Sequence, residues 1–171
     1  SSTAPPTAPT STNSSSGNTD SMKAAAYTRT GPPEVLEYVD VPDPVVAPKG
    51  VLVRVDAISI EGGDTLNRLG GAMTATPHIV GYQCAGTVIE VGAGVGPDSS
   101  VAVGDRVVCT MANGSHAELV SVSARSVWKV PDGADPVAAA CVPIAFGTAH
   151  DCLFEFGRLQ AGETVLVQAA A

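Results

Sequence analysis

Aromatic residues are scarce in this sequence: Phe, Trp and Tyr together make up 4% of its 171 residues. Hydrophobic residues nevertheless reach 44%, so a folded core must be built mainly from Val, Ala, Leu and Ile. Positive charge is also scarce, and the formal net charge of -8 argues against a nucleic-acid partner, whose phosphates require a basic face. No apolar run reaches the roughly 18 residues that a membrane span requires. The composition therefore predicts a globular domain without nucleic-acid or membrane partners.

Closely spaced cysteines, the usual ligands of structural zinc, are missing as well. No two of the four cysteines have the spacing of a C-x-x-C motif. We predict that they are small buried hydrophobic residues rather than metal ligands. His116 and Glu118 alternate along an expected strand, and we interpret this pair as a solvated strand face rather than a metal site. The cysteines are Cys84, Cys109, Cys141 and Cys152.

Apolar surface is nearly absent from residues 1–21, which consist mainly of Ser, Thr, Pro, Asn and Gly. Such a segment buries too little surface to offset the entropy of ordering it, so we expect a disordered leader or a cloning remnant. It has neither the basic start nor the apolar centre of a secretory signal, and Met22 resembles a true start. We therefore expect a cytoplasmic location.

Short apolar segments separated by Gly, Pro, Asp and Ser dominate residues 22–130. In 51–57, Val51, Val53 and Val55 share one face with Ala57, a pattern typical of a half-buried antiparallel strand. Many short strands at this spacing predict a small barrel or bent sandwich. The other expected strands are 23–27, 36–41, 86–91, 106–109, 116–121 and 126–130.

Helical patterns appear in two places. Asp64 is suited to cap a short helical turn, and Arg68, four residues later, is placed to form an ion pair with it. Asp135 followed by proline predicts the start of a second helix. A longer helix is expected over 144–156, and the apolar run 164–168 predicts a strand of a parallel sheet.

Glycines at 92, 94 and 96 imitate the fingerprint of a dinucleotide-binding turn. The segment follows an expected strand, but Pro97 comes next and no helical pattern does. A phosphate-binding turn requires that helix, since the N-terminus of the helix holds the pyrophosphate. We therefore predict a hairpin turn here.

Residues 79–108 combine a Gly-Tyr-Gln corner, a strand, a glycine turn and a Gly-Asp-Arg-Val strand start. With four further motifs, they resemble the N-terminal half of the medium-chain dehydrogenase/reductase superfamily. The resemblance implies a mainly β fold with α: a GroES-like barrel over 22–145, then at 146–171 the start of a Rossmann domain that the sequence does not complete. The further motifs are Gly-Pro-Pro-Glu-Val-Leu at 31–36, Val-Leu-Val-Arg-Val at 51–55, Asp-Thr-Leu-Asn-Arg at 64–68 and Gly-Thr-Ala at 147–149.

Zinc enzymes of this superfamily carry Gly-His-Glu at the corner, whereas this sequence has Gly81, Tyr82 and Gln83. The other two positions of catalytic metal ligands, both cysteines in the family, fall near Ile60 and Glu61 and near Ile144. The structural zinc lobe, with its four closely spaced cysteines, has no counterpart. The resemblance therefore points to the zinc-independent branch, the quinone oxidoreductases and related enoyl reductases, and it implies no metal site.

The resemblance also implies where substrate and cofactor would bind. Tyr82 would lie at the mouth of the cleft, where its phenol either donates a hydrogen bond to a substrate oxygen or packs on the wall with its hydroxyl in water. Thr148 corresponds to a threonine near the nicotinamide ring, and an ordinary helix-start threonine is the alternative. Glu61 and Leu66 fall where relatives often place Asn and Tyr near the nicotinamide, so this sequence departs from the family there.

The leading hypothesis is an NADPH-dependent oxidoreductase that reduces quinones or activated C=C bonds, such as enones and enoyl thioesters. We expect the chain to be an N-terminal fragment, inactive alone, with most of the NADPH site missing. The alternative is a non-catalytic GroES-like binding or structural module. We also expect the unpartnered strand at 164–168 to fray, to exchange between chains or to drive homo-oligomer formation.

Overall fold

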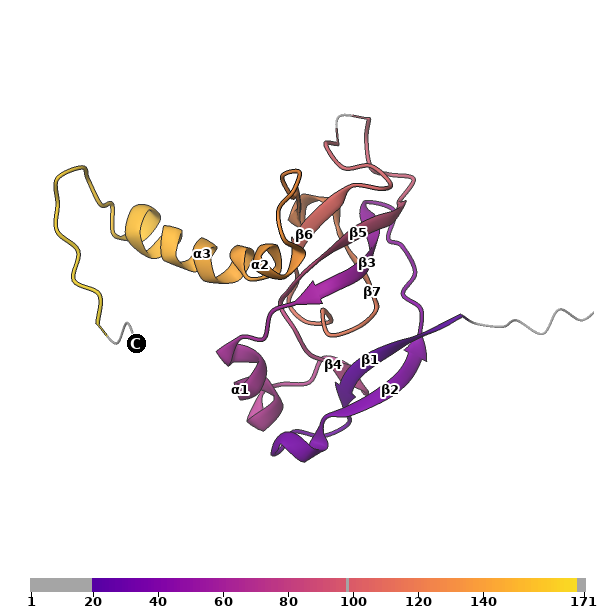
Figure 1. The fold of residues 1–171 in the computed structure, drawn as a ribbon. Coiled ribbons are helices and arrows are strands. Elements are labelled where there is room, and N and C mark those ends of the chain that lie inside the picture. Colours follow the sequence, from indigo (N-terminus) through magenta and orange to yellow (C-terminus); the bar gives the residue numbers. More distant parts are fainter. Residues whose placement is uncertain (1–19, 98, 169–171) are drawn as a thin grey trace, which may run out of the picture.

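The computed structural model describes residues 20–97 and 99–168, so the expected leader up to residue 19 and residues 169–171 lie outside the described part. The described residues form eight strands in two sheets, followed by helices that extend away from them (Figure 1). This architecture confirms the expected mainly β fold with α. Ser21, which we assigned to the leader from the sequence, is instead the first residue of β1 (Ser21–Tyr27).

Every strand pair in the two sheets is antiparallel. The smaller sheet has the order β2-β1-β4, and the larger has the order β7-β3-β5-β6-β8. The predicted strands agree with these elements within a few residues at most ends, since alternation of apolar residues fixes their existence better than their bounds. The remaining strands are β2 (Glu37–Pro42), β3 (Gly50–Ile58), β4 (His78–Ile79), β5 (Gln83–Val91), β6 (Arg106–Thr110), β7 (Leu119–Ser123) and β8 (Val127–Lys129).

Valine and cysteine fill the core of the larger sheet, as the scarcity of aromatic residues requires. Val51 and Val53 of β3 are 0% exposed, and burial of each side chain contributes about 1.5–3 kcal/mol. Cys84 of β5 and Cys109 of β6 are paired in register and lie side by side in this core as free thiols, with their sulfurs 3.1 Å apart. The prediction of buried cysteines is therefore confirmed for these two, and it is wrong for Cys141 and Cys152, which are exposed.

The smaller sheet is joined to the larger one through residues 116–118. The N–H of Ala25 in β1 donates to the carbonyl of His116 at 2.8 Å, and the N–H of Val55 in β3 donates to the carbonyl of Glu118 at 2.8 Å. The strand expected over 116–121 begins only at Leu119. His116 is buried and Glu118 is exposed, so the predicted solvated face made by both residues is wrong. Strand alternation does not apply to these residues because they lie before the strand.

The connections behave partly as expected. The segment after β5 is a turn whose Gly92 and Gly94 N–H groups donate to the carbonyls of Gly50 and Pro48, at 2.9 and 2.7 Å. It leads to the antiparallel strand β6, which confirms a turn rather than a dinucleotide fingerprint. The connection between β1 and β2 contains a short 3-10 turn, η1 (Pro33–Val35), and that between β7 and β8 contains η2 (Ala124–Ser126).

A helical arm follows the barrel and projects away from it (Figure 1). Asp135 caps its first helix by accepting the Ala138 N–H at 3.0 Å, as predicted. Residues 164–168, where we expected a strand, pair with no other part of the described chain, and that prediction is wrong because a strand requires a neighbour. None of the described helices is long and apolar enough to cross a membrane. The arm consists of α2 (Pro136–Ala140), α3 (Val142–His150) and the π-helical η3 (Asp151–Phe156).

Candidate active site

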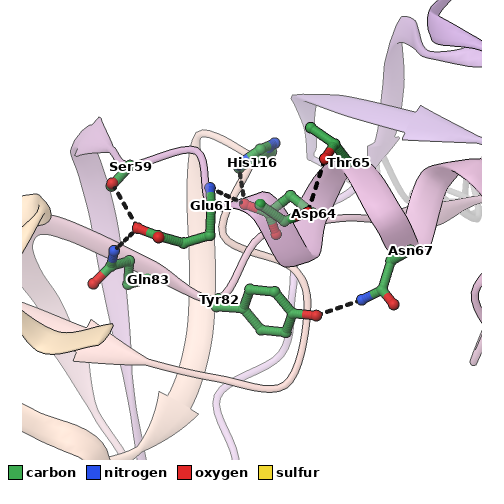
Figure 2. A network of polar contacts seen from close by, with 9 residues as sticks. Ser59, Glu61, Asp64, Thr65, Asn67, Tyr82, Gln83 and His116 are labelled. Atoms are coloured by element: carbon green, nitrogen blue, oxygen red, sulfur yellow. Dashed lines mark hydrogen bonds and ion pairs between the residues drawn. The ribbon is translucent and has the colours of Figure 1, made fainter. Parts of the chain in front are cut away.

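The site is built around the start of α1 (Gly62–Gly70), which follows β3. The N-cap of α1 is Glu61 rather than the predicted Asp64, which lies three residues later and caps the helix by accepting the Glu61 N–H at 2.8 Å (Figure 2). The expected ion pair with Arg68 is wrong. Arg68 donates from Nη1 to the carbonyl of Gly31 at 3.0 Å, whereas the Asp64 side chain points inward and its residue is 3% exposed.

His116 is the side chain that Asp64 meets instead. Its Nε2 lies 3.8 Å from the Asp64 carboxylate, and both side chains are buried (Figure 2). Burial lowers the pKa of the His116 imidazole, and the Asp64 carboxylate acts in the opposite direction. Sequence reasoning missed this contact because the residues are separated by 52 positions and His116 lies in a loop rather than on the expected strand.

Gln83, at the start of β5, is 0% exposed and both ends of its amide are used. Its Nε2 donates to the Glu61 carboxylate, and its Oε1 accepts the backbone N–H of Ile144 in α3 at 2.8 Å. The Ser59 hydroxyl donates to the same Glu61 oxygen at 2.9 Å (Figure 2). A chain of hydrogen bonds therefore runs from the end of β3 through β5 to the first turn of α3 in the arm.

This chain passes through positions at which the family resemblance places metal ligands. Two of these positions fall near Glu61 and Ile144, and the third is Tyr82, which directly precedes Gln83. The Gln83 amide thus cross-links two segments of the site by hydrogen bonds. Sequence reasoning did not single out Gln83 as a site residue. The available indication was a glutamine within an apolar strand, because a buried amide requires partners.

Tyr82 is partly buried, and its hydroxyl has a partner. Nδ2 of Asn67, in α1, donates to the Tyr82 hydroxyl oxygen at 2.5 Å (Figure 2). The Tyr82 hydroxyl is therefore hydrogen-bonded to the protein on one side. Asn67 was not singled out as a site residue from the sequence, and no local pattern could have identified it, since the contact joins α1 to the residue directly before β5.

The other predicted cofactor-binding residues are less closely grouped. Thr148 is exposed on α3, one helical turn after Ile144, so it follows the point where Gln83 binds the arm. Leu66 is 68% exposed on α1. Glu61 is held by Gln83 and Ser59 rather than being a free loop charge. The structure thus brings Glu61 into the same network as Gln83, with Tyr82 beside it. Thr148 and Leu66 are both exposed, and neither belongs to this network among the described residues.

Two further features bear on what this region can hold. No cluster of three or more His, Cys, Asp or Glu side chains suited to a metal ion occurs among the residues that the structure describes. An apolar groove of about 580 Å³ lies between the barrel and the arm, lined by residues that include Trp128, Val130, Ala138 and Val142. The groove lies beside the arm, and Tyr82 and the carboxylate of Glu61 are not in its lining.

The chain matches the alcohol dehydrogenase GroES-like domain over residues 47–132, which is half of its length. It belongs to that family. Quinone oxidoreductase-like protein 2 of Rattus norvegicus is 33% identical over 157 residues, covering 91% of this chain and 43% of that protein. Polyketide synthase GfsB of Streptomyces halstedii is 40% identical over 121 residues, covering 71% of this chain and 2% of that protein.

The fold agrees with the sequence match. Escherichia coli quinone oxidoreductase complexed with NADPH has a TM-score of 0.73 and 27% sequence identity, over 78% of this chain and 41% of that chain. The resemblance to the medium-chain dehydrogenase/reductase superfamily is thereby confirmed, and the relatives include oxidoreductases. The match to this chain spans less than half the length of each of the two quinone oxidoreductase relatives.

Proposed function

We propose that the chain forms the substrate-side domain of an NADPH-dependent oxidoreductase that reduces quinones or activated C=C bonds without zinc. The observation that carries the proposal is the Tyr82 phenol, which is held by Asn67 at the family's metal-ligand position. A phenol there can donate a hydrogen bond to a carbonyl oxygen as negative charge develops on it. The names of the relatives favour quinones as the first substrates to test.

NADPH would supply the hydride, and the described residues fit only part of this cofactor. Thr148 is exposed on α3 and free to approach a carboxamide, and Glu61 lies in the adjoining network. Leu66, on the exposed face of α1, is an apolar surface for the ring at most. The glycine turn after β5 is occupied with contacts to the Ala47–Gly50 loop and offers no cradle for phosphates. These residues would therefore form the nicotinamide side of the site and leave the phosphates to another segment.

Zinc independence is supported by the donors at the three ligand positions. A neutral phenol and the backbone of Ile144 are poor zinc ligands compared with cysteine thiolate and imidazole. The Glu61 carboxylate already accepts hydrogen bonds from the Ser59 hydroxyl and the Gln83 amide. Metal coordination by Glu61 would have to displace both donors.

The test is NADPH oxidation by the complete product of the gene, with 1,4-naphthoquinone and 2-cyclohexenone as substrates and with metal analysis of the same sample. We expect turnover without stoichiometric transition metal. Tyr82→Phe should lower kcat by roughly 100-fold, the usual loss on removal of one donor to a developing oxyanion. Unchanged kcat in this variant, or one equivalent of bound zinc, would contradict the proposal, and lack of turnover with both substrates would favour the non-catalytic alternative.

A further inference from the structure

The Tyr82 ring lies against one face of α1. A Cβ atom added at Gly63 would come within 2.8 Å of the ring, so the phenol covers this glycine closely. Asn67 is four residues later on the same helical face, where its Nδ2 meets the Tyr82 hydroxyl oxygen at 2.5 Å (Figure 2). Gly63 and Asn67 together therefore form a seat that holds the ring by packing and the hydroxyl by a hydrogen bond.

The Asn67 side-chain amide presents its nitrogen to Tyr82 and its oxygen to the side of Gly71. Its Oδ1 lies near Gly71, at 2.6 Å from the position that a Cβ atom would take there. The backbone N–H of Gly71 donates to the backbone carbonyl of Asn67 at 2.8 Å, and this hydrogen bond closes the last turn of α1. The amide oxygen thus faces Gly71, and the NH₂ group faces Tyr82. Because an amide NH₂ only donates hydrogen bonds, the Tyr82 oxygen is the acceptor and its own O–H remains available to donate.

We propose that Asn67 is a positioning residue that fixes Tyr82 as a hydrogen-bond donor toward the carbonyl oxygen of a quinone or enone. This inference rests on the proposed function and adds the residue that sets the direction of the bond. Donation from Asn67 polarises the phenol, and consecutive hydrogen bonds strengthen one another in a partly buried site. The matching substrate group is an oxygen without a proton, which accepts the Tyr82 O–H and gains negative charge as hydride reaches the conjugated carbon.

Two substitutions of the same residue separate this role from simple packing. Asn67→Asp keeps the shape of the side chain but replaces the donor with a carboxylate, which accepts the Tyr82 O–H and withdraws it from the substrate. Asn67→Ala removes both functions and leaves the O–H free. A packing role predicts that the isosteric Asp variant is the better enzyme, whereas the proposed role predicts that it is the worse one.

Hydrogen-bond direction is measured first on the 171-residue chain, by NMR with tyrosine labelled with ¹³C at Cζ. The Tyr82 resonance is assigned as the one that disappears in Tyr82→Phe. We expect it to move toward the phenolate position in Asn67→Asp, since the O–H then donates to a carboxylate, and to move much less in Asn67→Ala. An identical spectrum in the two variants would overturn the assigned direction.

Turnover is then measured on the complete gene product with NADPH and 1,4-naphthoquinone. We expect kcat to decrease in the order wild type, Asn67→Ala, Asn67→Asp, with the Asp variant close to the roughly 100-fold loss of Tyr82→Phe and with little change in KM. Asn67→Asp should add nothing to Tyr82→Phe in the double variant. An Asp variant at least as active as the Ala variant overturns the role of Asn67 and leaves the proposed function intact, whereas lack of turnover in the wild type overturns both.

Discussion

The barrel and the helical arm use apolar residues in opposite ways. Val51 and Val53 of β3 are 0% exposed, whereas Phe146 of the arm is 67% exposed and Phe156 is 82% exposed. Within α2, α3 and η3, Ala140 is the residue that is buried. The backbone hydrogen bonds of a helix form within the helix itself, but burial of its apolar side chains requires a facing surface. The difference shows that hydrophobic composition predicts burial only where the topology supplies a second layer.

The largest effect is expected when one methyl group is added to a glycine in each region. A Cβ atom at Gly86, in β5, would lie 2.1 Å from the carbonyl oxygen of Arg54, whereas one at Gly147, in α3, would meet nothing within 4 Å. We expect Gly86→Ala to lower the free energy of unfolding by at least about 3 kcal/mol. Gly147→Ala should raise helix stability by about 0.5–1 kcal/mol. Urea unfolding, followed by Trp128 fluorescence and by circular dichroism, measures the effect of both substitutions. Equal effects would contradict the proposed difference between the barrel and the arm.

A smaller effect is expected from removing apolar atoms in each region. Val53→Ala empties part of a closed core and should cost about 2 kcal/mol of unfolding free energy. Leu166→Ala, where the side chain is 83% exposed, should change it by less than about 0.5 kcal/mol. The comparison uses the same denaturation assay at one protein concentration. Surface substitutions rarely change the unfolding free energy by as much as about 1 kcal/mol, so a cost of that size at Leu166 would indicate that this side chain is buried in solution.

The hydrogen-bonded link between the two regions is the next target. Gln83→Leu keeps the approximate volume, but it leaves the Ile144 N–H without its partner and removes the Gln83 donor from the Glu61 carboxylate, which retains the Ser59 hydroxyl. We expect a loss of about 1–2 kcal/mol in unfolding free energy and a selective loss of amide hydrogen-exchange protection in α3. The matched control is Thr87→Val, on the same strand as Gln83, which removes an exposed hydrogen bond to Asp56 of β3. Equal protection of α3 in both variants would argue that Gln83 does not hold the arm.

The smallest expected effect is the dependence of stability on pH. Burial lowers the pKa of both His78 and His116 in the folded chain. Unfolded histidine titrates near pH 6.5, so the unfolded chain takes up protons first as the pH falls. The unfolding free energy should therefore be highest above about pH 6.5 and should decline as the pH falls toward the folded pKa values. His116→Asn should flatten this decline below about pH 6.5, and an unchanged slope would show that burial of His116 is not responsible.

The barrel strands were predictable because their evidence is local. Alternation in 51–57 identified β3, and Asp135 followed by proline identified the start of α2. The strand at 164–168 was not correctly predicted, because an apolar run indicates a strand only if another strand lies next to it. The position of His116 was also wrong, since alternation was extended into a loop whose hydrogen bonds go to two different strands.

The candidate site was predictable in part. The corner at Tyr82 was located from the sequence, but its contact with Asn67 joins residues whose separation is set by how α1 packs on the barrel. The double role of Gln83 was missed for the same reason, since one of its partners, the Ile144 N–H, belongs to the arm. Tertiary contacts between elements carry no periodic pattern, whereas elements themselves do.

The four thiols divide evenly between the two regions, so their rates of chemical modification distinguish the exposed arm from the closed core of the barrel. Cys141 and Cys152 are exposed on the arm, whereas Cys84 and Cys109 are enclosed between β5 and β6. An alkylating reagent should therefore modify two sites at once and the other two only when the sheet separates. The slow phase of this modification would report on the transient separation of β5 and β6, without any added label.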